Sequence, residues 1–77
     1  MSWNHRILAH EDGNDMFFQI HEVYYDKSGK PDGYTKNGVS VGAESLEGVK
    51  WVLKKMKDCV NKPVLLADGF PDEYIKK

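Results

Sequence analysis

The chain has 77 residues, of which 40% are hydrophobic and 30% are charged, and its formal net charge is −1 at pH 7. A chain of this length forms one domain, and its composition is ordinary for a globular protein. The near-neutral charge argues against a protein that works mainly by attraction to nucleic acid or to anionic membranes.

A core of this size, without disulfide or metal, rarely supplies more than about 3–5 kcal/mol of stability, so a partner protein or self-association would help. The single cysteine, Cys59, cannot form an internal disulfide, which is typical of a reducing compartment. Residues 3–6 interrupt any signal-peptide pattern, and no apolar run approaches the roughly 18 residues that span a bilayer. We therefore expect a cytoplasmic protein with no membrane partner.

Two strands are predicted first, at residues 3–10 and 16–25, joined by a turn at residues 11–15. Alternation divides each strand into two faces. In the first strand one face carries Trp3, His5, Ile7 and Ala9, and the other carries Asn4, Arg6, Leu8 and His10. In the second strand one face carries Phe18, Ile20, Glu22 and Tyr24, and the other carries Phe17, Gln19, His21, Val23 and Tyr25. We expect the helix to cover the face of Phe18 and Ile20, unless a bulge near Glu22 swaps the faces.

Residues 26–30 (DKSGK) favour a type I turn closed by a glycine bulge. A third strand through Tyr34 and Thr35 would lie at a sheet edge, because Pro31 has no N–H to donate. Asn37-Gly38 allows a hairpin that returns residues 39–41 along residues 34–36. A plain loop leading to the helix is the alternative.

The helix is predicted from an apolar stripe whose members are Leu46, Val49, Leu53, Met56 and Val60, widened by Val52 and Cys59. Ser45 suits the N-cap, Asn61 suits a left-handed end, and Pro63 stops the helix. Gly48 suggests a close approach to the sheet. Lys50, Lys54 and Lys57 would face solvent.

Residues 64–66 form a candidate last strand, and residues 68–77 a tail with Phe70, Tyr74 and Ile75 as packing points. The fold class is therefore α+β: one domain, residues 1–67, with an antiparallel sheet of three or four strands and one C-terminal helix packed on one face.

The sequence does not contain the residue spacing of the metal and catalytic motifs that it partly matches. His21 and Glu22 are neighbours in a strand and therefore point to opposite faces. An H-E-x-x-H motif beginning at His21 would need a second histidine at position 25, which is tyrosine. His5, His10 and His21 could gather across paired strands and bind zinc, but their spacing is not diagnostic. Cys59 resembles a buried hydrophobe more than a nucleophile. We predict no catalytic residue, no metal and no cofactor.

Aromatic side chains are the remaining signal, because large aromatic residues carry much of the energy of protein interfaces. The predicted interaction surface is the sheet face away from the helix, made of Phe17, Val23, Tyr25 and Tyr34. Its partner would be an unknown protein or a second copy of the chain. The alternatives are a histidine-based metal-binding protein or small enzyme, and RNA binding through Lys50, Lys54 and Lys57, which the negative charge sum disfavours.

The segments WNHRI, IHEVYYD, GKPDGYT, LEGVKWVLKKM and KPVL, between residues 3 and 66, resemble a family of small uncharacterised bacterial and prophage-associated proteins. This resemblance implies a compact bacterial domain and no particular activity. At Asn37-Gly38 the sequence departs from the family pattern, which would place a proline-containing loop at this position. The layout around VGAESLEGVKWVLKKM is similar to the HicB-type antitoxin domain at the level of fold, although that family's DNA-binding tail has no counterpart here.

Overall fold

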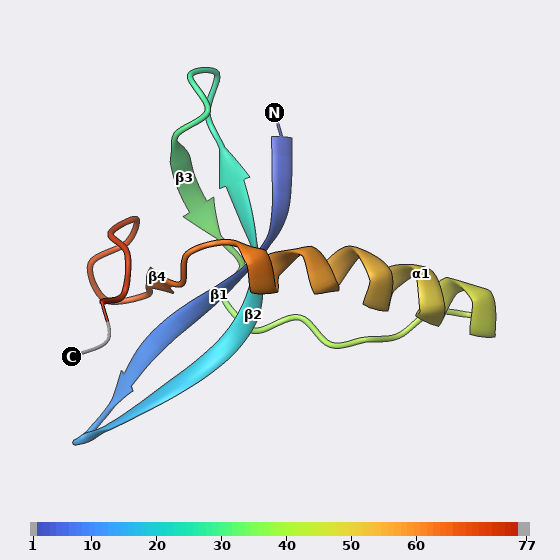
Figure 1. Ribbon diagram of the computed structural model, residues 1–77, viewed down its shortest axis with the longest axis horizontal. Helices are drawn as coiled ribbons and strands as arrows, with labels where there is room; N and C mark the ends of the chain where they lie inside the picture. Colours follow the sequence, from blue (N-terminus) through green and yellow to red (C-terminus); the bar gives the residue numbers. More distant parts are fainter. Residues whose placement is uncertain (1, 76–77) are drawn as a thin grey trace.

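The computed structural model describes residues 2–75, which form a sheet and one helix. The elements, in chain order, are β1 (Ser2–Asp12), β2 (Asp15–Tyr25), β3 (Pro31–Tyr34), α1 (Leu46–Lys57), the 3-10 helix η1 (Asp58–Asn61) and β4 (Leu65–Leu66). The strand order is β3-β2-β1-β4 (Figure 1). The predicted α+β class is confirmed. The fourth strand runs parallel to β1, so the sheet is mixed instead of wholly antiparallel.

β1 and β2 form a long antiparallel hairpin that twists strongly through the centre of the molecule (Figure 1). Its turn is tight, because Asp12 pairs with Asp15 and only Gly13 and Asn14 lie between them. Gly13 has a φ of 63° while Asn14 stays at negative φ, a pattern typical of a type II′ turn. This register places His5 opposite Glu22 and Ile7 opposite Ile20.

The turn at residues 26–30 has the predicted form. The Gly29 N–H donates to the Asp26 carbonyl at 3.0 Å, and Gly29 has a φ of 84°. The Asp26 carboxylate also accepts from the Ser28 and Lys30 N–H groups. β3 then pairs with β2 as an edge strand, as Pro31 predicts, with a register shift at Tyr24/Tyr25.

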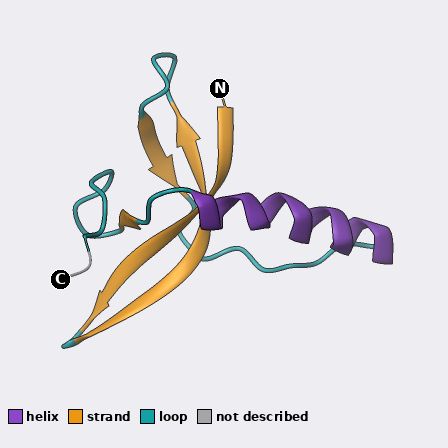
Figure 2. Cartoon of the chain, viewed as in Figure 1, coloured by secondary structure: helices purple, strands orange, loops and turns teal. Residues whose placement is uncertain are grey.

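No hairpin forms at Asn37-Gly38, so the alternative of a plain loop is what the chain adopts. The Val39 N–H donates to the Ile20 carbonyl, which ties the start of this loop to β2. The loop, residues 35–45, then runs alongside α1 (Figure 2). A Cβ at Gly48 would meet Ala43 at 2.8 Å, so this glycine permits a close approach to the loop and not to the sheet.

The helix begins as predicted and ends differently. The Ser45 Oγ accepts from the Gly48 N–H at 3.0 Å, which caps the first turn. At the other end Asn61 is not left-handed, because no non-glycine residue of the described chain has a positive φ. The helix tightens into η1 instead, and Lys62 returns to an extended conformation before Pro63.

The main core lies on the sheet face away from α1. Leu8, Val23 and Leu65 are buried there, and Tyr25, Tyr34, Ala67 and Phe70 pack around them. The cover comes from the C-terminal segment, residues 67–75, which includes the described part of the predicted tail, residues 68–77. The Tyr74 N–H donates to the Val64 carbonyl, and the Leu66 N–H donates to the Asp72 carbonyl. Ile75, a predicted packing point, is 78% exposed.

The outer limits of the predicted domain and tail, residue 1 and residues 76–77, lie outside the described residues. Within residues 2–75, α1 and η1 are too short and too polar to cross a bilayer.

Candidate functional site

The apolar stripe of α1 is largely uncovered. Met56 and, in η1, Cys59 are buried. Leu46, Leu53 and Val60, which belong to the same stripe, are 65%, 51% and 63% exposed. An isolated helix of about twelve residues is marginal in water and depends on tertiary packing. The uncovered side chains are therefore the least expected feature of this fold.

A groove runs between this stripe, the sheet and the loop of residues 35–45. Its volume is about 390 Å³. Its walls are almost wholly apolar and consist of Ile7, Ile20, Val41, Leu53, Met56, Lys57, Cys59 and Val60. Burial raises the pKa of the Cys59 thiol, so this residue acts as a buried hydrophobe, as predicted.

Lysines border the exposed side of the stripe. Lys50 lies four residues after Leu46, and Lys57 lies four residues after Leu53. Residues at this spacing are neighbours on a helix surface. We name the set Leu46, Leu53, Val60, Lys50, Lys54 and Lys57 the basic helix surface. All six side chains are exposed.

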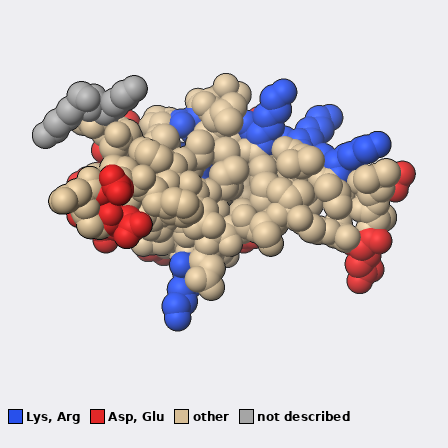
Figure 3. Space-filling view, turned by 90° about the horizontal axis from the view of Figure 1, so that it is seen from below, with Lys and Arg blue, Asp and Glu red and all other residues tan. Residues whose placement is uncertain are grey.

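The far end of the β1–β2 hairpin has the opposite character. Its exposed side chains are Glu11, Asp12, Asp15, Met16, Phe17 and Phe18, which we name the acidic hairpin end. It shares no hydrogen bond with α1 among the described residues. Figure 3 shows acidic side chains at both ends of the molecule, with most of the basic side chains along one side between them.

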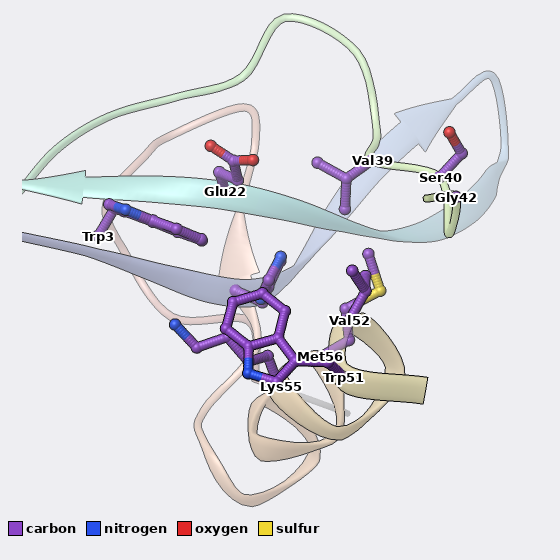
Figure 4. A pocket seen from close by; sticks show the side chains of 10 residues that line it. Trp3, Glu22, Val39, Ser40, Gly42, Trp51, Val52, Lys55 and Met56 are labelled. Atoms are coloured by element: carbon purple, nitrogen blue, oxygen red, sulfur yellow. The ribbon is translucent and has the colours of Figure 1, made fainter. Parts of the chain in front are cut away.

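A second, more polar pocket lies at the other margin of the helix (Figure 4). It encloses about 210 Å³ between the strands, the loop and α1. Trp3 and Glu22 come from the sheet, while Trp51 and Lys55 come from the helix. The Lys55 Nζ lies 5.2 Å from the centroid of Trp3 and 4.9 Å from that of Trp51. The contact with Trp3 joins the helix to β1, whereas the contact with Trp51 lies within the helix.

His5 and Glu22 share this pocket because they pair across β1 and β2. Burial lowers the pKa of His5, and the Glu22 carboxylate opposes that effect. The Tyr24 hydroxyl donates to Glu22 at 3.0 Å, which raises the pKa of Tyr24. No hydrogen bond joins His5 to Glu22 within residues 2–75, where the Glu22 carboxylate accepts from Tyr24 instead. A two-residue turn at Gly13-Asn14, if assumed from the sequence, would have predicted that His5 lies opposite Glu22.

The three histidines do not form one cluster. His10 and His21 meet on the core face with 2.9 Å between their Nε2 atoms, and the His21 Nδ1 lies 2.9 Å from the Thr35 carbonyl. His5 lies on the opposite face. In the described part of the chain no three histidine, cysteine or acidic side chains converge as metal ligands. The arrangement considered for zinc is therefore wrong as a three-histidine site.

The predicted interaction surface does not stay open at its centre. Val23 is 0% exposed, and Tyr25 and Tyr34 are partly buried against the core. The Phe70 ring, 4.8 Å from that of Tyr34, covers this face. Exposure of Val23 was therefore a wrong prediction, because the C-terminal segment supplies a second cover for the sheet. Phe17 is 54% exposed and remains available.

Comparison with known proteins adds no relative. No protein-family model, curated protein or solved structure matches the chain significantly.

Proposed function

We propose that this chain is a non-catalytic protein-binding module and that its working surface is the basic helix surface with the adjoining apolar groove. The observation that carries the proposal is the exposure of Leu46 and Leu53 in α1 and of Val60 in η1. A helix that buries little of its own stripe gains stability when a partner covers the rest.

The groove supports this proposal because its lining is apolar and continuous with the exposed stripe. Contiguous apolar surface with a polar border is the pattern of protein interaction sites. Lys50, Lys54 and Lys57 provide that border, and they favour a partner with acidic side chains around an apolar centre. The resemblance to HicB-type domains remains a prediction.

Site-specific photo-crosslinking in the cells from which the chain comes tests the proposal. A benzophenone side chain at position 53 lies on the proposed surface, and one at position 32 lies on the exposed Asp32 of β3 as a control. We expect a protein adduct from position 53 that is absent from position 32 and that a second substitution, Val60→Glu, removes. Equal labelling from both positions, or an adduct destroyed by ribonuclease, contradicts the proposal.

A further inference from the structure

The chain has two surfaces of opposite charge that each expose apolar side chains. The basic helix surface contains three lysines, and the acidic hairpin end contains three carboxylates. Each surrounds exposed apolar side chains, such as Leu53 on the helix and Phe17 and Phe18 on the hairpin. Figure 1 shows the hairpin end and the helix projecting away from each other, so one copy does not bring its own two surfaces together.

We propose that the partner of the basic helix surface is the acidic hairpin end of a second copy of this chain, in a two-fold symmetric dimer. This inference rests on the proposed function and names its partner. In such a dimer each copy gives a hairpin end and receives one, so the same contact occurs twice.

Charge complementarity favours this partner over a helix-to-helix dimer. Two basic helix surfaces facing each other would bring six lysines together, and like charges across an interface cost several kcal/mol. The acidic hairpin end carries negative charges, which attract the lysines of the basic helix surface. It also carries Asp12 directly opposite Asp15, and like charges in a cross-strand pair are destabilising. Lysines from a second copy would relieve this repulsion.

The apolar content of the two surfaces is also matched. At the hairpin end Met16 and Phe18 lie on one face and are 38% and 46% exposed, while Phe17 lies on the other face and is 54% exposed. The Phe18 ring also contacts the Tyr74 ring, with 5.3 Å between their centroids. The groove beside Leu53 is apolar and open, and aromatic rings are the side chains that contribute most at interface centres. A stable dimer buries about 800 Å² on each partner, which is roughly one seventh of the 5899 Å² surface of this chain. Two contacts per dimer make that area attainable.

A charge-exchange experiment tests the inference. The first variant reverses the hairpin end (Glu11→Lys, Asp12→Lys, Asp15→Lys), and the second reverses the helix (Lys50→Glu, Lys54→Glu, Lys57→Glu). All six positions are exposed, so both variants should fold. Circular dichroism checks this, and analytical ultracentrifugation over a range of concentrations gives the dimer dissociation constant.

We expect the wild-type chain to dimerise and each variant alone to dimerise at least about tenfold more weakly, since both of its contacts then join like charges. Mixed in equal amounts, the two variants should form a heterodimer of near wild-type affinity, because both contacts then join opposite charges. A general loss of surface charge or of folding would not produce this recovery.

Three results would overturn the inference. They are a wild-type chain that stays monomeric at all concentrations, a dimer insensitive to the hairpin reversal, and a mixture that fails to recover. The crosslinking experiment tests the proposed function separately from the dimer. If position 53 crosslinks to a different protein and the chain is monomeric, the binding surface stands and its identification with a second copy falls.

Discussion

The core face of the sheet and the apolar stripe of α1 have similarly regular patterns of apolar residues, but only the sheet face is buried. On the sheet, Leu8 and Val23 are fully buried because the C-terminal segment folds over them. On the helix, Leu53 and Val60 follow an equally clear periodicity and remain more than half exposed. Periodicity therefore shows which side of an element is apolar, and a separate segment decides whether that side is covered.

The largest expected contrast between the two regions is the cost of removing a leucine. Leu8→Ala should lower the free energy of unfolding by about 2–5 kcal/mol, because it leaves a cavity in the core. Leu53→Ala, at low concentration where the chain is monomeric, should cost less than about 1 kcal/mol. Urea unfolding of both variants measures the difference. Equal costs would mean that the helix packs as tightly as the sheet.

A second contrast concerns the cover of the core face. Phe70 packs against Tyr34, and Ile75 is 78% exposed. We expect Phe70→Ala to lower the free energy of unfolding by about 2 kcal/mol, since a partly buried ring is lost. Ile75→Ala is the matched control and should be close to neutral. If Phe70→Ala behaves like its control, the C-terminal segment does not cover the core in solution.

The smallest expected effect is a dependence of stability on pH. Burial lowers the pKa of His21 and of His5 in the folded chain, whereas in the unfolded chain both titrate near 6.5. The unfolded state therefore binds more protons as the pH falls through about 6.5, and stability is lost below that pH.

Urea midpoints at pH 7.5, 6.5 and 5.5 measure this effect. The wild-type midpoint should fall on acidification, and His21→Gln should show a shallower fall, with the remainder due to His5. His21→Gln is expected to be less stable at every pH because it loses the contact with Thr35. Parallel pH profiles for the two proteins would show that His21 does not carry the dependence.

Local features were predictable where neighbouring residues determine them. The Asp26–Gly29 turn depends on a carboxylate and a glycine within four positions, and the Ser45 cap depends on an N–H three residues away. The edge position of Pro31 follows from its missing N–H. The end of the helix was missed at Asn61, because a tighter 3-10 turn competes with the left-handed conformation.

The candidate site was predicted only in part. Its lysines and its apolar stripe are visible in the spacing of residues 46–60, but their exposure is not. The pairing of His5 with Glu22 required the hairpin register, and the covering of Val23 required residues far along the chain. Contacts of this kind have no local signal.

By itself the sequence determined the α+β class, the turns at residues 11–15 and 26–30, the start of the helix and the identity of each apolar face, because these depend on interactions between residues a few positions apart. Only the tertiary structure decided which apolar face was closed by the chain itself. Leu65 and Phe70 reach the core from more than forty residues beyond Val23, and covering one sheet face with this segment left the stripe of α1 open. A short chain has too few apolar residues to cover both.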